Sequence, residues 1–211
     1  MNEGCSQISD KSGNKSKYIN TSIKTDSLNI PKDSTTFYIP IHFLSDTLEK
    51  WKADTFMDNW FSKMLYGLHE PLLYNRIEKK DIYRFTWLRS FHHPVSIRIE
   101  KCDNKVFLYT KETSGAGGYS PGKIIVDEKT EISEDKWDTF ITKLNKVQFW
   151  EQPAFKQETG VDGAEWIMEG TTEDDYHVMI RWSEPSSDNF KECCKYLLGL
   201  SGLKFPKSEI Y

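Results

Sequence analysis

The sequence has few cysteines and no long apolar run, and each absence excludes a class of protein. The four cysteines form no CxxC pair and none of the spacings of a zinc knuckle or a dense disulfide framework. Cys193 and Cys194 are neighbours on a predicted helix, where a bond between them would be strained. No run of 18 apolar residues is present, so the sequence predicts no transmembrane helix and no apolar segment of a secretory signal.

The sequence also lacks an excess of basic charge. It has 28 Lys and Arg against 32 Asp and Glu, a formal net charge of -4. Binding of a phosphate backbone requires a basic stripe, so nucleic acid is not an expected partner. We expect no cofactor, no transmembrane segment and a possible protein partner, while the oligomeric state stays open.

Aromatic residues, in contrast, are plentiful, with seven Trp and an aromatic fraction of 14%. They are ample for one core of roughly 175 residues. Residues 1–36 are rich in Ser, Lys, Asn, Thr and Asp, with too few apolar residues to offset the entropy of ordering them. The sequence therefore predicts a flexible polar tail over residues 1–36 and a single domain over residues 37–211.

The start of the chain permits two localisations. As given, the chain is expected in the cytoplasm. Gly4, Cys5 and Ser6, followed by a polar stretch, resemble the mature start of a bacterial lipoprotein. If a leader is missing, Cys5 would instead anchor a periplasmic or membrane-attached protein.

Apolar periodicity predicts the order helix, four strands, helix, hairpin, helix. Pro40 interrupts the apolar residues 37–44, which fits an edge strand or an extended lead-in. Short turns between neighbouring strands favour an α+β domain, with an antiparallel sheet of about five to seven strands and three main helices packed largely on one face. The expected strands are residues 82–89, 95–101, 106–111, 123–126, 164–170 and 176–182, and the expected helices begin near residues 45, 133 and 186.

The hairpin at residues 162–182 allows a specific register. Pairing apolar with apolar side chains places Trp166 opposite Ile180 and Met168 opposite Val178. The same register predicts cross-strand pairs between Glu165 and Arg181 and between Glu169 and His177.

The glycine-rich residues 113–122, TSGAGGYSPG, have two interpretations. Gly117 and Gly118 could turn main-chain N–H groups toward an anion, but a strand rather than a helix follows them, unlike a P-loop or dinucleotide site. A wide hairpin connection fits better. The alternative is a loop that grips a ligand or partner, with Tyr119 as its exposed aromatic anchor.

Two further groups of polar residues are candidate binding residues. Arg89, His92 and His93 lie at a corner between two strands, and joining His92 or His93 with His177 and Glu169 would give a metal site or an acid and base pair. The second group is a polar stripe across the sheet, interpreted either as a solvated face or as a recognition surface. It comprises Arg98, Glu165, Glu169, His177 and Arg181.

The segments RSFHHPVSIRIE, SGAGGYSPGKI, DGAEWIMEG and YHVMIRW, closed by YLLGLSGL, resemble a family of uncharacterised bacterial proteins over residues 89–203. The resemblance implies no activity, so it assigns no catalytic residue and no metal ligand. The leading hypothesis is a non-enzymatic binding module, of inhibitor or immunity type, that uses an open sheet face and the glycine-rich loop. The alternatives are a small hydrolase or metal-dependent enzyme using His92 or His93, His177 and Glu169, and a structural envelope lipoprotein.

Overall fold

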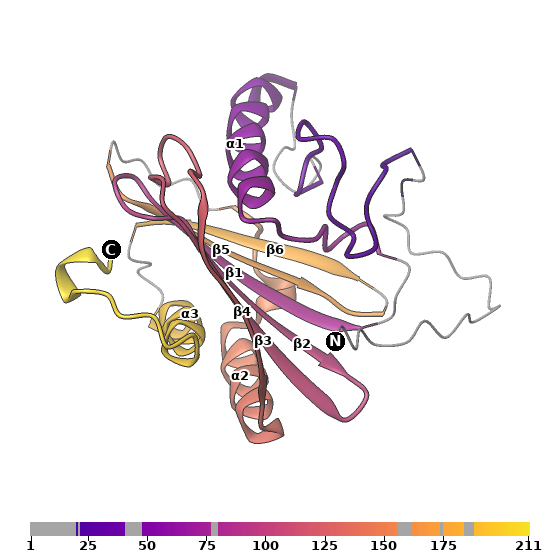
Figure 1. Cartoon of the computed structure of the whole chain (residues 1–211), viewed down its shortest axis with the longest axis vertical. Helices are drawn as coiled ribbons and strands as arrows, with labels where there is room; N and C mark the ends of the chain where they lie inside the picture. Colours follow the sequence, from indigo (N-terminus) through magenta and orange to yellow (C-terminus); the bar gives the residue numbers. More distant parts are fainter. Residues whose placement is uncertain are drawn as a thin grey trace.

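A computed structural model describes residues 20, 22–40, 48–76, 80–155, 162–173, 175–183 and 188–211; for residues 48–55 and 188 it describes the backbone alone. Six strands form one antiparallel sheet in the order β4-β3-β2-β1-β5-β6 (Figure 1). The predicted α+β class and the predicted order of elements are confirmed. The elements are α1 (Leu48–Gly67), β1 (Asp81–Arg89), β2 (Val95–Cys102), β3 (Lys105–Thr113), β4 (Ile124–Ile132), α2 (Glu134–Val147), β5 (Ala164–Thr171), β6 (Tyr176–Trp182) and α3 (Asp188–Leu200).

The ends of α2 illustrate how local sequence sets the helix bounds. Ser133 precedes the helix in an extended conformation, and Glu134 and Asp135 place negative charge in the first turn, where the helix dipole favours it. Gln148 then takes a left-handed conformation, and its N–H donates to the carbonyl of Asn145. The chain therefore leaves α2 directly into a short 3-10 turn, η2 (Phe149–Glu151).

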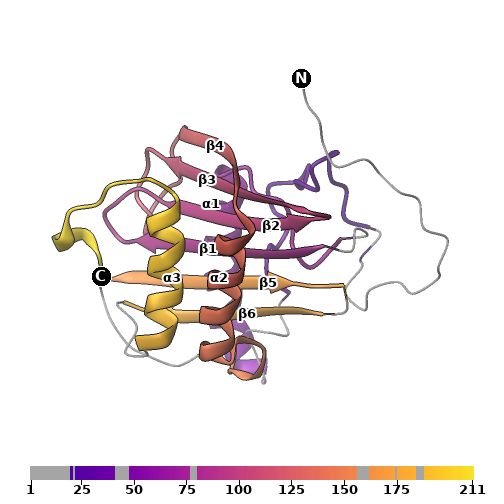
Figure 2. The same cartoon turned by 90° about the horizontal axis from the view of Figure 1, so that it is seen from below.

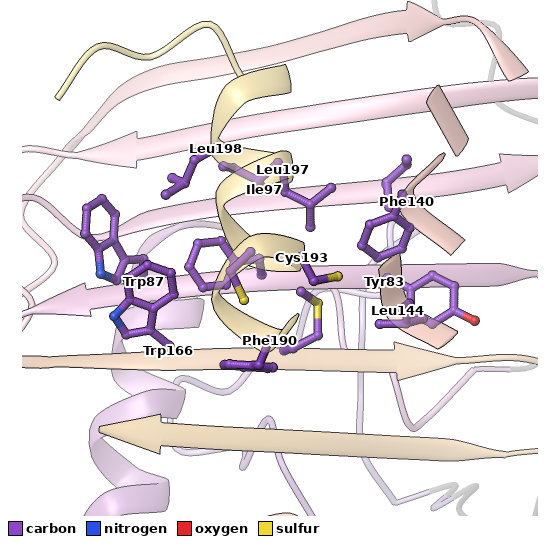
Figure 3. Close-up of a cluster of buried hydrophobic side chains, with 14 of the residues drawn as sticks. Tyr83, Trp87, Ile97, Phe140, Leu144, Trp166, Phe190, Cys193, Leu197 and Leu198 are labelled. Atoms are coloured by element: carbon purple, nitrogen blue, oxygen red, sulfur yellow. The ribbon is translucent and has the colours of Figure 1, made fainter. Parts of the chain in front are cut away.

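Two of the three helices, α2 and α3, cover one face of the sheet, which we call the apolar face (Figure 2). Every second residue of the central strands points into this layer, as a strand period of two requires. The helices contribute Phe140, Leu144, Phe190 and Leu197 to the same cluster (Figure 3). Cys193 and Cys194 lie in it as buried free thiols, and burial raises the pKa of Cys193 to about 12.

The third helix, α1, lies against the opposite face, which we call the charged face (Figure 2). Phe61 and Met64 of α1 pack there on Ile82, Ile167 and Ile180. The prediction that the helices pack largely on one face therefore holds for two of them and not for α1. Among the described helices, none combines the length and the apolar character that crossing a membrane requires.

The predicted register of the β5 and β6 hairpin is wrong by one residue. Trp166 lies opposite Arg181, and Glu169 lies opposite Val178. Glu165 and Arg181 consequently point to opposite faces of the sheet. The prediction assumed that one face of the hairpin meets water. Because helices cover both faces, apolar side chains are needed on both, and matching apolar with apolar residues does not select a register.

Residues 22–40 pack against the chain that follows α1. Asn29 donates from its side chain to the carbonyls of Leu72 and Asn75, and Leu72 N–H donates to the carbonyl of Asn29. Tyr38 and Ile39 are completely buried. The folded part of the described chain therefore begins before residue 37. Residues 37–40 form no strand, and the rest of the predicted lead-in, residues 41–44, lies outside the described residues.

Candidate functional site

Six of the predicted binding residues meet at one end of the sheet. Arg89, His92 and His93 lie at the turn between β1 and β2, and Gly117, Gly118 and Tyr119 lie in the connection from β3 to β4. Main-chain bonds join the two segments: Gly117 N–H donates to His92 O at 2.9 Å, and Gly118 N–H donates to Ser90 O at 3.1 Å. We call residues 90–94 and 114–122 together the loop surface.

The glycines of this connection allow two backbones to approach closely. A Cβ atom at Gly117 would lie 2.6 Å from Arg89 O, and one at Gly118 would lie 2.9 Å from Ser90 O. The N–H group of Gly115 is also used, since it donates to Pro121 O at 2.9 Å. An anion cradle would need these N–H groups, so the loop is a packed connection between β3 and β4 rather than a cradle.

Helix α1 holds the loop surface from the side of the charged face. The indole N–H of Trp60 donates to Gly117 O at 2.6 Å, and Lys63 Nζ donates to Tyr119 O at 3.0 Å. Trp60 and Lys63 are three positions apart on the helix, so their side chains lie on the same side of α1. The position of the loop is thus fixed by the turn after β1 and by α1.

Two aromatic side chains project from this fixed frame. Phe91 is 57% exposed and Tyr119 is 65% exposed, and their ring centroids lie 6.2 Å apart. Sequence analysis singled out Tyr119 but not Phe91. The signal for Phe91 in the sequence was an aromatic residue inside a polar turn. Its contact with Tyr119 depends on how the two loops pack, which the sequence does not show.

The other side of the turn is occupied by residues near the end of the described chain. Arg89 places its guanidinium 4.1 Å from the centre of the Trp87 ring and forms an ion pair with Glu209 at 3.2 Å. Burial lowers the pKa of Arg89, and Glu209 offsets part of this effect. His92 Nδ1 shares a hydrogen bond of 2.9 Å with the hydroxyl of Tyr211, whereas His93 Nδ1 lies 3.2 Å from a carboxylate oxygen of Glu112. The two imidazoles therefore have separate partners.

Arg98 and Glu169 belong to a buried ion network on the charged face. Arg84 of β1 donates to Glu169 at 2.6 and 2.9 Å, and to the carbonyl of Pro71 at 2.7 Å. Glu70 accepts from Arg98 at 2.8 Å and from Arg84 at 3.4 Å. Arg84, Glu70 and Glu169 are 0% exposed. This part of the predicted polar stripe is therefore not an open recognition surface.

Charges within the network set the protonation of its carboxyl groups. Burial raises the pKa of Glu70, but Arg98, Arg84 and Lys111 outweigh burial and hold that pKa below its ordinary value. For Glu169, burial outweighs the bonds from Arg84 and Tyr176, and its pKa is raised. The pKa of Arg84 is raised, because Glu169 and Glu70 outweigh the effect of burial. The guanidinium therefore stays charged between two carboxyl groups of different acidity.

A further buried carboxyl group lies on α1 beside this network. Asp58 is 0% exposed, and one of its oxygens accepts a long bond of 3.5 Å from Ser62 while the other has no hydrogen-bond partner. Burial raises its pKa to about 7. Arg84, Glu70 and Asp58 were not among the candidate residues that the sequence pattern predicted. The signal for Arg84 was a single charge inside the apolar strand IYRFTWL.

The remaining predicted residues do not join these groups. His177 lies on the apolar face with its ring 5.0 Å from Phe149, and burial lowers its pKa. Arg181 donates to the carbonyls of Pro153 and Ala154 beside the edge strand β6, and Glu165 is buried on the charged face.

The acid and base pair of the enzyme alternative is not assembled. His177 and Glu169 point to opposite faces, and His92 and His93 lie at the far end of the sheet from His177. In the part of the chain that the structure describes, no group of three or more His, Cys, Asp or Glu is arranged to hold a metal ion.

Neither the models of known protein families nor the curated proteins give a match to this chain. The predicted lipid attachment concerns Cys5, which lies outside the described residues. Chemistry at the loop surface is therefore the basis for a proposal about function.

Proposed function

We propose that the protein is a non-enzymatic binding module whose anchor is the aromatic pair Phe91 and Tyr119. The observation that carries the proposal is the exposure of both rings, 57% and 65%, on two loops bonded to each other and to α1. Large side chains exposed together mark interaction sites more often than single exposed apolar residues do. The partner is inferred to be a protein, because aromatic anchors dominate protein interfaces.

The rigidity of the loop surface supports this proposal. Binding by a mobile loop loses free energy to ordering, whereas a surface held in advance loses less. The bonds donated by Gly117, Gly118, Trp60 and Lys63 are among those that hold the loop surface. The proposed interface differs from the open sheet face expected from the sequence, since Arg98, Glu165 and Glu169 are 6%, 3% and 0% exposed.

Of the two alternatives, the envelope lipoprotein stays a prediction that depends on Cys5. The hydrolase alternative loses its geometric support because its histidines and Glu169 are not together. An inhibitor or immunity role remains compatible with the binding module, and the identity of the partner would decide it.

Affinity capture from cells that produce the protein tests the proposal. We expect the full chain to retain one partner in stoichiometric amount, and Phe91→Ala/Tyr119→Ala to lose it at an unchanged melting temperature. The matched control is Leu28→Ala/Phe155→Ala, since these side chains are 68% and 42% exposed elsewhere on the surface. Capture of the same partner by the Phe91 and Tyr119 variant, or the absence of any partner, would refute the proposal.

A further inference from the structure

The last residues of the described chain return to the loop surface. After α3, Gly202 has a φ of +75°, in the left-handed region that favours glycine, so the chain turns away from the helix there. Residues 203–211, which we call the return segment, then run back to the end of the sheet beside the turn after β1 (Figures 1 and 2). Within the return segment, Glu209 N–H donates to Pro206 O and Ile210 N–H donates to Lys207 O.

The sheet contacts the return segment through side chains that donate hydrogen bonds. The indole N–H groups of Trp87 and Trp166 both donate to the main-chain oxygen of Tyr211, at 3.3 and 2.9 Å. The two indoles lie side by side at one end of the apolar core, with ring centroids 5.5 Å apart (Figure 3). Two buried donors are thus directed at one main-chain oxygen, that of Tyr211, the last residue in the structure.

Charged and aromatic contacts add sequence preference to this arrangement. Glu209 lies 3.2 Å from Arg89 Nη1 and 3.8 Å from His92 Nε2. Phe205 packs edge-on against Trp87 with centroids 5.3 Å apart, and the Arg89 guanidinium lies 4.9 Å from its ring. The return segment therefore presents an aromatic ring, a carboxylate four residues later and a second aromatic residue two positions beyond it.

We propose that Trp87, Arg89, His92 and Trp166 form a peptide-binding site, and that the return segment is its intramolecular ligand. We call these four residues the peptide site. Its external ligand is an extended segment of a partner protein with the same chemistry: an aromatic residue, an acidic residue and a main-chain oxygen free to accept two hydrogen bonds. His92 directly follows Phe91 in the chain, so a partner anchored on the loop surface places its own segment beside the peptide site.

An external peptide can replace the return segment in the peptide site because of how that segment is held. Its bonds to the sheet come from Trp, Arg and His side chains, and each is available to another peptide once the segment leaves. The tethered segment competes as if present at millimolar concentration, since a short linker gives an effective concentration of that order. An external peptide is therefore bound weakly until the return segment is loosened.

A labelled peptide tests the proposal on the full chain. The probe is the nine-residue sequence LKFPKSEIY, residues 203–211, carrying a fluorophore and followed by fluorescence anisotropy. We expect Phe205→Ala/Glu209→Gln, which loosens the return segment, to bind the probe at least about tenfold more tightly than the wild type. Adding His92→Gln or Arg89→Met to that variant should remove the gain. A probe with Ala at its Phe position and Gln at its Glu position is the control for sequence preference.

Three results would overturn the proposal. The first is equal probe affinity in the wild type and the loosened variant, measured at a temperature where both are folded. The second is equal affinity for the control probe. The third is a concentration-dependent dimer that the probe dissociates, since a second copy of the chain would then be the occupant. Phe91→Ala/Tyr119→Ala should leave probe binding unchanged, so failure of the peptide site and failure of the proposed function are distinguishable.

Discussion

In the central strands β1 and β5, the two faces of the sheet are buried equally well but by different chemistry. On the apolar face, Phe85, Trp166 and Met168 are 0% exposed among carbon-rich neighbours. On the charged face, Arg84 and Glu169 are also 0% exposed. Arg84 donates hydrogen bonds to Glu169, and Glu169 also accepts one from the hydroxyl of Tyr176. Apolar packing tolerates rearrangement of similar volumes, whereas a buried charge requires a partner in one position.

The charged face therefore fixes how the chain around α1 is placed on the sheet. Arg84 of β1 bonds to Glu70 and Pro71, which directly follow the end of α1. The hydroxyl of Tyr38 donates to the carbonyl of Glu70 and adds a third segment to the same point. We infer that the network contributes to the specificity of this arrangement more than to net stability, because removing charges from water offsets much of their attraction.

Removing the shared cation should give the largest effect on the charged face. We expect Arg84→Met to lower the free energy of unfolding at pH 7 by about 3–5 kcal/mol, since it leaves the buried carboxyl group of Glu169 without the cation that pairs with it. The deficit should shrink as the pH falls from 7 to 5, because burial already raises the pKa of Glu169 and the loss of Arg84 raises it further. Urea unfolding at both pH values measures it.

The double variant Arg84→Met/Glu169→Gln is the control for this prediction. It removes the unpaired charge of Glu169 while an amide can still accept the bond from Tyr176, so part of the lost stability should return. A deficit that is independent of pH and unchanged in the double variant would mean that lost packing, not charge, explains the effect.

On the apolar face, we expect Phe140→Ala to cost about 3–5 kcal/mol, because Phe140 is 0% exposed and packs edge-on against Tyr83. The loss should be the same at pH 5 and pH 7, since no charge is involved. Unfolding in urea beside the Arg84 variant gives the direct comparison of the faces. A Phe140 deficit that varied with pH as strongly as the Arg84 deficit would remove the distinction between them.

Replacing Asp58 on the charged face should raise the stability of the protein rather than lower it. Its pKa is raised by burial from 3.8 to about 7, so the folded protein holds this proton more tightly than the unfolded chain does. The carboxyl group thus destabilises the fold progressively as pH rises from about 4 to about 7. We expect Asp58→Asn to stabilise the protein by about 2–4 kcal/mol above pH 7 and by nothing below pH 4. Thermal unfolding across this range measures the difference, and a constant difference at all pH values would contradict it.

The smallest effect is expected for Lys111 at the margin of the charged face. Its Nζ donates to His69 O at 2.7 Å and lies 3.7 Å from Asp127, which is half exposed. We expect Lys111→Met to cost about 1–2 kcal/mol, since the apolar stem is kept and one charge-assisted hydrogen bond is lost. Denaturant unfolding measures this change. A loss as large as that of Arg84→Met would place Lys111 inside the network.

Much of the fold was predictable because spacing along the chain is a local property. The strand 82–89 and the helix ending at Gly67 follow from periods of two and 3.6, and the structure has them at Asp81–Arg89 and Leu48–Gly67. The strand at residues 123–126 was predicted too short, because the polar second half of β4 pairs with β3 through its backbone rather than its side chains.

The candidate site was predictable only in part. Arg89, His92 and Tyr119 were identified from their places in turns, where exposed polar and aromatic residues are informative. Phe91, Trp87 and Trp166 were not identified as site residues, because Trp87, Trp166 and the return segment meet through the sheet order and the path of the chain after α3. Tyr211 lies 45 positions from Trp166 and 124 positions from Trp87. Contacts over such separations leave no pattern in the neighbouring sequence from which they could be predicted.

By itself, the sequence determined which segments are helices and strands, their order and the α+β class, since these depend on periodic burial and on short turns. The tertiary structure alone decided the hairpin register, the side of the sheet that α1 covers and the partners of Arg84, Glu70 and Glu169. The physical reason is that strands β1, β5 and β6 are buried on both faces. Alternation of apolar and polar residues along a strand then no longer identifies a buried and an exposed face. Only the elements packed against the sheet determine which charged side chains form pairs.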